Sequence, residues 1–432
     1  MIYHNIEKLK YNYNKLLASG LGLANSVIVS ASKNTSKINL FMYQTSIPDY
    51  HKIMFDNQNT SSYHIAGYGQ TIEESLTRTL GETVERYSFM SLYHLLKDNI
   101  IKESYSELEK KAKVIPLDLI NVVNSEDKYF KQLDKDAEIE WLLLKNYITN
   151  EDIYVPFFMI GSNKNKNISL PAMSTGTATH ISQQKALINA FTEAFQLDAF
   201  MNAWYGSKKL KKIDITKIKS KEFNIVLEKT FKKIDNLEII VLENPFRNTK
   251  FKNFITIIKS KENKYPYCSV GIQGGLNYEY AIIRSIMEAA AIFMNLQAFY
   301  IYEYDKINNL TLQNTKESYN LDDTFLYWSN YNDKKSKDNK LNSIISDEYT
   351  IVDNINYSEN DELKELLEIA KKELYYLSIL DITPLELKKY GYSTIRIIAP
   401  ELLPMCFPAL PYLNHPNFPK GGENDLFPHP LP

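Results

Sequence analysis

The stretch GQTIEESLTRTLGETVERYSFM, residues 69–90, has the 3.6-residue periodicity of a helix and offers an N-cap residue at its start. Two later stretches repeat its pattern, HISQQKALINAFTEAFQLDAFM at 180–201 and GLNYEYAIIRSIMEAAAIFMNLQ at 275–297. We align the three on Glu82, Glu193 and Glu288. Each then has a capping residue eleven positions earlier, namely Thr71, Ser182 and Asn277. The pattern predicts three copies of one supersecondary unit, a turn leading into a capped helix.

The residues before each glutamate follow a common order. Small residues stand seven and three positions before it, and apolar residues stand six and two positions before it. Because residues three, four and seven apart share a helix face, we expect the apolar stripe to pack on a sheet. The small residues and the carboxylate would then line an edge or cavity with room for a ligand. The small residues are Ser75, Thr79, Ala186, Ala190, Ala281 and Ser285.

Carboxylates from equivalent helices would form an oxygen-rich cluster, which suits a hard cation such as Mg2+. Metal, protonation or nearby arginines would relieve their mutual repulsion. The candidate metal ligands are Glu82, Glu85, Glu193 and Glu288. The alternative is that they are ordinary solvated helix residues.

Composition limits the class of protein. The 432 residues are 44% hydrophobic and 24% charged, which is typical of a globular protein, and the net charge of −2 argues against a general nucleic-acid or membrane-surface binder. Cys268 and Cys406 are the only cysteines, which excludes a disulfide framework and a cysteine-based zinc site. The N-terminus lacks the apolar core of a signal peptide, and we find no apolar run of about 18 residues. These features predict a cytoplasmic protein.

Arginine is scarce, since only five of the 50 basic residues are arginine. An arginine that stands against this bias can mark a place where a planar, permanently charged fork is needed. The five are Arg78, Arg86, Arg247, Arg284 and Arg396.

The chain shows no linker of Gly, Ser or Pro type, which favours one integrated α/β (α+β) body. We predict that 1–66 is its N-terminal part and 67–432 its catalytic body, with 301–350 as a polar surface insertion. A further helix is predicted over 361–377. Strands are predicted at NSVIVSAS, INLFMYQT, IEWLLLKNY, LEIIVLE, FITIIKS and STIRIIAP.

The sequence finishes FPHPLP, residues 427–432, with proline at every second position. Such a segment favours an extended polyproline-type rod. It is either a stiff ending of little consequence or a rod that delivers the carboxylate of Pro432 to a particular place.

Common nucleotide and hydrolase motifs are not found. The sequence has no GxxxxGK[ST] loop, and GYGQ at 67–70 lacks the third glycine of a dinucleotide fingerprint. Neither GxSxG nor HExxH occurs, and the histidines show no metal-ligand spacing.

Several of these segments resemble motifs of the YcaO superfamily. The ExxER at Glu82 to Arg86 is similar to its first nucleotide-binding motif, and STGTATHISQQKALINAFTEAFQLDAF and SVGIQGGLNYEYAIIRSIMEA resemble its second and third. STIRIIAPELLP and the proline-rich ending resemble the C-terminal part of azoline-forming members. The chain is most similar in style to the stand-alone cyclodehydratase D proteins of streptolysin-S-like gene clusters, which make thiazole- and oxazole-modified peptides.

The resemblance implies a YcaO-type fold of related sheet-plus-helix units around ATP and magnesium. Glu82, Glu85, Glu193 and Glu288 would hold magnesium between the ATP phosphates. Arg86, Arg284 and Arg396 would contact phosphate or position those carboxylates. Gln196 and Leu197 replace the Glu and Arg of the commoner motif, which leaves the metal count at that corner open.

The resemblance also implies an activity and partners. A Cys, Ser or Thr of a ribosomal precursor peptide would attack the preceding carbonyl, and phosphorylation of the amide oxygen by ATP would yield a thiazoline or oxazoline. Pro432 would act through its carboxylate as a base or orient the amide, beside Arg284 and Arg396. An E1-like leader-binding protein and a flavin-dependent dehydrogenase are the expected partners, with a homodimer within the complex as a further arrangement.

Three alternatives stay open on the sequence. The same ATP site could serve thioamide or amidine formation. The chain could be a non-catalytic scaffold subunit, with Gln196 marking a decayed site. An unrelated carboxylate–amine ligase would also use clustered carboxylates for magnesium.

Overall fold

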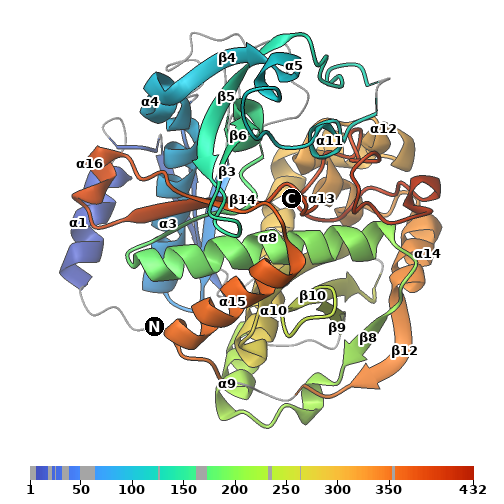
Figure 1. The fold of residues 1–432 in the computed structure, drawn as a ribbon. Coiled ribbons are helices and arrows are strands. Elements are labelled where there is room, and N and C mark those ends of the chain that lie inside the picture. The colour runs from blue at the N-terminus through green and yellow to red at the C-terminus, as the bar shows by residue number, and fades with distance from the viewer. Residues whose placement is uncertain are drawn as a thin grey trace.

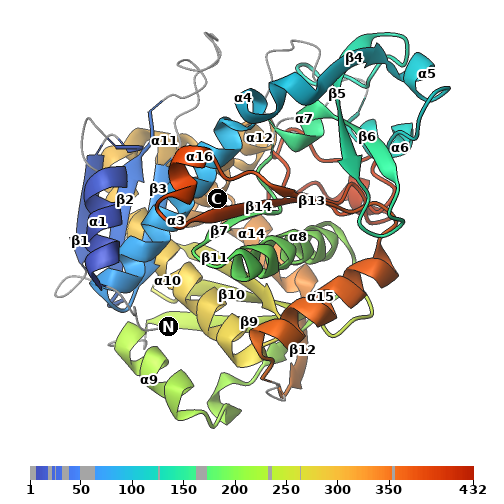
Figure 2. The same ribbon diagram turned by 60° about the vertical axis from the view of Figure 1, so that its left-hand side comes forward.

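The computed structural model describes residues 6–17, 22–24, 26–31, 38–48, 64–124, 127–161, 173–231, 236–262, 264–352 and 356–432. Each predicted unit is a strand, a two-residue turn and a long helix. Figure 1 labels the three long helices, and Figure 2 labels all three strand–helix pairs. The turns are residues 70–71, 181–182 and 276–277. The pairs are β3 (His64–Gly69) with α3 (Ile72–Met90), β7 (Thr177–His180) with α8 (Gln183–Tyr205), and β11 (Cys268–Gly275) with α10 (Tyr278–Tyr302).

Each long helix packs on the sheet to which its own strand belongs (Figure 2). The first sheet has the order β1-β2-β3, the second β13-β14-β7 and the third β11-β10-β9-β8-β12, while β4-β5-β6 form a fourth sheet. The remaining strands are β1 (Ser26–Ala31), β2 (Phe41–Ser46), β4 (Ile100–Ser104), β5 (Glu138–Lys145), β6 (Asp152–Pro156), β8 (Leu210–Ile213), β9 (Leu237–Pro245), β10 (Lys252–Ser260), β12 (Ile345–Thr350), β13 (Ser378–Asp381) and β14 (Ser393–Ile398).

Other helices cover the edges of these layers. Helix α1 packs on α3, and α15 packs on α8. Their bounds, with those of the shorter helices, are α1 (Ile6–Leu16), α4 (Leu92–Leu96), α5 (Tyr105–Leu108), α6 (Leu117–Ile120), α7 (Phe157–Ile160), α9 (Lys221–Thr230), α11 (Tyr304–Asn309), α12 (Leu312–Lys316), α13 (Leu321–Ser329), α14 (Lys334–Ile344), α15 (Glu359–Glu373) and α16 (Leu385–Lys388).

The predicted strands, the predicted helix and two of the three predicted caps are confirmed. All six predicted strand runs contain a strand, and the helix predicted over 361–377 is α15. The side chains of Thr71 and Ser182 accept hydrogen bonds from the N–H groups of Glu74 and Lys185, as capping requires. Asn277 stands at the third N-cap position but does not cap its helix, since its Oδ1 accepts from the N–H of Tyr357.

The expected role of the small residues is wrong. All six are buried, and Ser75, Thr79 and Ser285 make hydrogen bonds to residues of a sheet. Ser75 Oγ donates to the carbonyl of Gly67, and a Cβ at Gly67 would overlap the backbone of Ser75 and Thr79. A Cβ at Gly271 would likewise overlap the backbone of α10. The small residues therefore let helix and sheet backbones approach closely.

The interpretation of 301–350 as a polar surface insertion is also wrong in its central part. Helices α13 and α14 bury Tyr327, Trp328 and Leu341, and β12 extends the five-stranded sheet. Lys337 and Lys340 are buried too, because their amines donate to main-chain carbonyls, that of Lys340 to Trp204 at 2.7 Å. Lysine has a long apolar stem that can be buried while its amine is hydrogen-bonded. The many lysines of this segment therefore made a buried region look like a surface in the sequence.

Helix α10 is long and apolar enough to pass a composition test for a membrane span, but it is largely buried against β10 and β11. This burial is what a core helix of a folded domain requires. Both cysteines are free and buried.

Candidate active site

The three aligned glutamates make the same backbone contact. Each accepts a hydrogen bond from the N–H sixteen residues earlier, on the strand that precedes its helix. The donors are Ala66 for Glu82, Thr177 for Glu193 and Ile272 for Glu288, the last at 2.5 Å. The repeat seen in the sequence is therefore also a repeat in how each carboxylate is fixed.

Glu85 links the first unit to the second. Its carboxylate accepts from the N–H of Thr179 on β7 and interacts electrostatically with Glu193 and Glu82. Glu82 in turn raises the pKa of Glu288 on α10. The four predicted metal ligands therefore share one electrostatic cluster built from α3, α8 and α10.

Burial raises the pKa of every carboxylate in this cluster. It brings the pKa of Glu193 and that of Glu288 to about 7, although backbone N–H groups and arginines pull these values down. Burial also raises the pKa of Glu82, and that of Glu85 rises further because Glu193 and Glu82 lie near it. The ionised cluster thus carries negative charge that a cation or a proton would relieve.

Arg86 and Arg396 border the carboxylates in different ways. Arg86 forms an ion pair with Glu82 at 3.6 Å and donates to Ser174 Oγ. Arg396 is buried and donates to the main-chain carbonyls of Met173 at 2.9 Å and Met159 at 3.2 Å. Burial lowers its pKa to about 10, while Glu193 and Glu85 oppose that shift. These bonds make Arg396 a residue that holds the loop beside β7.

Arg284 belongs to a second charged group beside Glu288. It donates to the hydroxyl of Tyr68 at 2.8 Å, lies over the same ring, and approaches Glu74 at 3.7 Å. Arg78 pairs with Glu74 at 2.6 Å and also lies over Tyr68. Within the described ranges, Arg78 Nε and Arg284 Nη1 are buried without a hydrogen-bond partner. Such donors fit an anionic ligand.

Gln196 does not take the place of a second Glu85. Its side-chain oxygen accepts from the N–H of Gly274 on β11 at 2.7 Å. Leu197 is buried in the core. Gln196 therefore ties the second unit to the third.

The proline-rich segment 427–432 is anchored along helices α8 and α13. Phe427 accepts from Trp204 of α8, and His429 lies against Phe200 one turn earlier on that helix. The segment therefore runs antiparallel to α8. From Phe427 to His429 the contacts move from Trp204 to Phe200, which is the direction of the turn of α8 that carries Glu193 and Gln196. In both ribbon views the C-terminus lies near the centre of the molecule.

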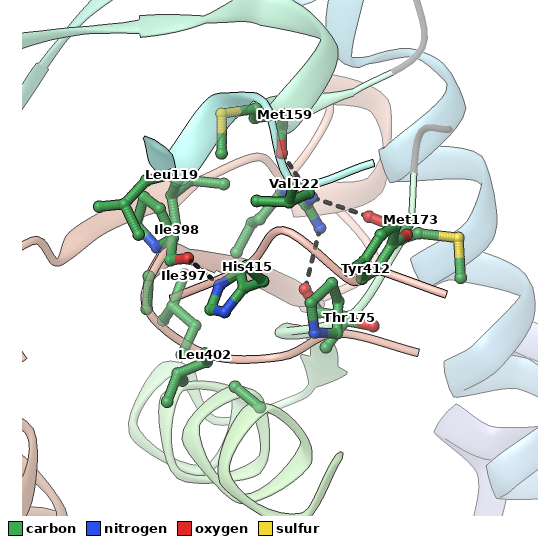
Figure 3. Close-up of a pocket in the computed structure, with 15 residues that line it drawn as sticks. Leu119, Val122, Met159, Met173, Thr175, Ile397, Ile398, Leu402, Tyr412 and His415 are labelled. Atoms are coloured by element: carbon green, nitrogen blue, oxygen red, sulfur yellow. Dashed lines mark hydrogen bonds between the residues drawn. The ribbon is translucent and has the colours of Figure 1, made fainter. Parts of the chain in front are cut away.

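Arg396 is one of the residues that line a small cavity, and Figure 3 shows this cavity with its other lining residues. Its volume of about 100 Å³ is lined by apolar residues such as Leu119, Met159 and Ile398, with Thr175 and His415 among them. Sites for drug-sized ligands measure roughly 300–1,000 Å³, so this cavity is too small for a nucleotide.

Comparison with known families now identifies the fold. A family model described as YcaO cyclodehydratase, ATP- and Mg2+-binding, matches residues 66–403. The chain belongs to the YcaO family. The predicted relationship to YcaO proteins is therefore confirmed, and no curated protein sequence matches the chain.

Solved YcaO structures have the same mixed α/β fold. A heterocyclase in complex with substrate and cofactor has a TM-score of 0.70 at 15% identity over 92% of this chain, and the chain spans 52% of that protein. YcaO from Methanopyrus kandleri, bound with AMPPCP and Mg2+, has a TM-score of 0.61 at 13% identity, covering 93% of this chain and 91% of the other. A chain of the E. coli microcin synthetase McbBCD complex has a TM-score of 0.62 at 14% identity, and the match covers 94% of this chain and 96% of the other.

ATP and Mg2+ are the cofactors of this YcaO protein. The residues present fit them, since carboxylates with raised pKa values adjoin Arg78 and Arg284, each of which has a buried nitrogen without a hydrogen-bond partner. Among the described residues no three carboxylates converge tightly enough to bind one ion alone. This fits Mg2+, which keeps waters and substrate phosphates as ligands beside one or two carboxylates.

Sequence reasoning did not assign Glu74, Tyr68 or a role for Arg78. The scarcity of arginine had marked Arg78, but nothing in the local sequence indicated that Arg78 and Arg284 would both lie over the ring of Tyr68. That contact depends on how α10 meets β3, which a one-dimensional pattern does not contain.

Proposed function

We propose that this YcaO protein is an ATP-dependent cyclodehydratase that converts Cys, Ser or Thr of a ribosomal precursor peptide into thiazoline or (methyl)oxazoline. The observation that carries the proposal is the anchored segment 427–432, which follows α8 toward the turn bearing Glu193. A thioamide- or amidine-forming enzyme, or a scaffold, gives no reason for a proline rod at this place.

The proposed reaction forms one bond and breaks another at the same carbon. The Cys thiol, or the hydroxyl of Ser or Thr, loses its proton as it adds to the preceding carbonyl carbon. The amide nitrogen loses its proton as the ring C=N bond forms, and the former carbonyl oxygen would leave as inorganic phosphate. Bound MgATP supplies the phosphoryl group that turns this oxygen into a good leaving group.

The residues of this chain would hold and neutralise charge at fixed positions. Glu82, Glu85, Glu193 and Glu288 would bind magnesium, with their orientation set by the strand N–H groups. Arg86 and Arg284 would contact phosphate, whereas Arg396 would position the loop at Met173. Such preorganised charges stabilise phosphoryl transfer without reorganisation during the reaction.

The carboxylate of Pro432 would take the amide proton or orient the amide, as the proposed general base. A leader-binding E1-like protein would bring the peptide, and a flavin-dependent dehydrogenase would oxidise azolines to azoles. We propose the cytoplasm as the place where these partners meet.

The test is conversion of the cognate precursor peptide with its partner protein and MgATP, followed by mass spectrometry. The full chain should remove one water per ring and form one phosphate for each. Glu193→Gln should abolish ring formation, whereas Glu228→Gln on the exposed face of α9 should not. Phosphate release without water loss, or oxygen replaced by sulfur, would reject azoline formation.

A further inference from the structure

We propose that Trp204, Trp328 and Thr324 are positioning residues that hold segment 427–432 in register with α8. They would set where Pro432 stands against the carboxylate cluster. The activity part of this inference rests on the proposed function, but the attachment of the segment does not.

The chemistry of the segment makes side-chain donors necessary. Prolines 428, 430 and 432 have no N–H, so half of the segment offers only carbonyl acceptors. A rod of this kind cannot join a sheet on both sides or fix itself through its own backbone. Its position along the helices must come from groups that donate to it.

Three buried side chains supply these donors. Trp204 Nε1 donates to the carbonyl of Phe427 at 2.8 Å, Trp328 Nε1 to that of Pro428 at 2.9 Å, and Thr324 Oγ1 to that of Leu431 at 2.7 Å. Trp328 and Thr324 are one turn apart on α13, in reverse order to the residues they bind. The segment is therefore held antiparallel to α13 as well as to α8.

The donors also brace one another. The rings of Trp204 and Trp328 meet edge to face with centroids 5.6 Å apart, and Trp328 packs on Phe427 at 5.5 Å. His429 adds a bond from its Nε2 to the carbonyl of Cys406 at 2.8 Å. An indole N–H only donates, so these bonds admit one register of the segment and leave a buried carbonyl unpaired in another.

The chain provides a matched control. Trp141 is as buried as Trp328 and donates to the carbonyl of Glu103 at 2.9 Å, but it lies in β5 within the fourth sheet. Two of the three tryptophans of the protein thus serve the segment and the third does not. Replacing each by phenylalanine removes an N–H and keeps an aromatic ring.

The first readout is hydrogen exchange of a C-terminal peptide that contains the amides of His429 and Leu431. Trp204→Phe, Trp328→Phe and the near-isosteric Thr324→Val should speed exchange there, and Trp141→Phe should not. Unchanged exchange in all three variants would overturn the inference. This measurement needs neither peptide nor partner, so it decides the attachment even where the wild-type chain forms no rings and the proposed function fails.

The second readout separates positioning from general damage. In the full protein with partner and peptide, the variants should lose about tenfold to a hundredfold in kcat, the cost of misplacing a reacting group by about 1 Å, while KM for ATP is unchanged. In a chain lacking Leu431 and Pro432 the same substitutions should have no further effect. An undiminished loss in the truncated chain, or an equal loss in Trp141→Phe, would overturn the inference.

Discussion

Replacing Glu288 by glutamine should stabilise the ligand-free protein at pH 8 and change its stability little at pH 5. Burial raises the pKa of Glu288 from 4.5 to about 7, so the folded protein holds this proton more tightly than the unfolded chain. Ionisation therefore destabilises the fold as pH rises from about 4.5, and the loss is complete above about 7. Glutamine has no proton to lose.

The magnitude follows from the shift. One pKa unit corresponds to about 1.36 kcal/mol, so a rise to about 7 gives an upper limit of roughly 3.4 kcal/mol at pH 8 and less than about 1 kcal/mol at pH 5. Glu288 keeps partial contact with solvent, so we expect about 1–3 kcal/mol at pH 8. The glutamine oxygen can still accept from Ile272 N–H, which leaves the backbone contact in place.

Urea unfolding at the two pH values, without nucleotide or magnesium, measures this difference. Glu228→Gln is the control, because that side chain is exposed on α9. A Glu288→Gln variant that is less stable than the parent at pH 8, or equally changed at both pH values, would refute the idea that the empty cluster carries uncompensated charge.

Three further predictions concern the same site. Binding of Mg2+ with a non-hydrolysable ATP analogue near pH 7 should release protons, because the pKa values of Glu193 and Glu288 are about 7. Calorimetry in buffers of different ionisation enthalpy detects this release, and binding heats that do not depend on the buffer would contradict it. Arg284→Lys should weaken nucleotide binding about tenfold, because it removes the planar guanidinium that lies over Tyr68. Arg247 binds main-chain carbonyls of Glu373 and Glu401, so Arg247→Lys should leave the affinity unchanged. Equal affinities of the two variants would count against a phosphate role for Arg284. Gly271→Ala should lower the free energy of unfolding by about 1–3 kcal/mol in thermal unfolding, because its Cβ overlaps α10. Gly81 has open space around it, so Gly81→Ala should raise the free energy of unfolding by up to about 1 kcal/mol. A Gly271→Ala variant as stable as the parent would show that helix and sheet can separate.

Local patterns predicted the parts of this fold that depend on neighbours in sequence. Helix periodicity and capping residues located α3, α8 and α10, and Glu82, Glu193 and Glu288 do share one cluster. Long-range packing was the part that patterns missed. The small residues were assigned to a ligand face because spacing alone does not show that glycines such as Gly67 lie opposite them.

Long-range packing also explains why the segment around α13 and α14 was wrongly predicted to lie on the surface. Its many Asn, Asp and Lys residues are typical of a surface, but Lys340 can be buried because the carbonyl of Trp204 accepts a hydrogen bond from its amine. Composition cannot report a partner that lies 136 residues away in the chain. For Pro432 the sequence left two readings open, and the bonds to Trp204, Trp328 and Thr324 favour a segment with a defined position.

The two-residue turns that join each strand to its helix make chain length a determinant of this site. A residue inserted at 181–182 would rotate α8 by about 100° relative to β7, since a helix has 3.6 residues per turn. Glu193 would then leave the strand N–H groups, although every side chain in the site was unchanged. We therefore expect these turns to reject insertions that a surface loop would accept, so a single-codon insertion there acts as an active-site mutation.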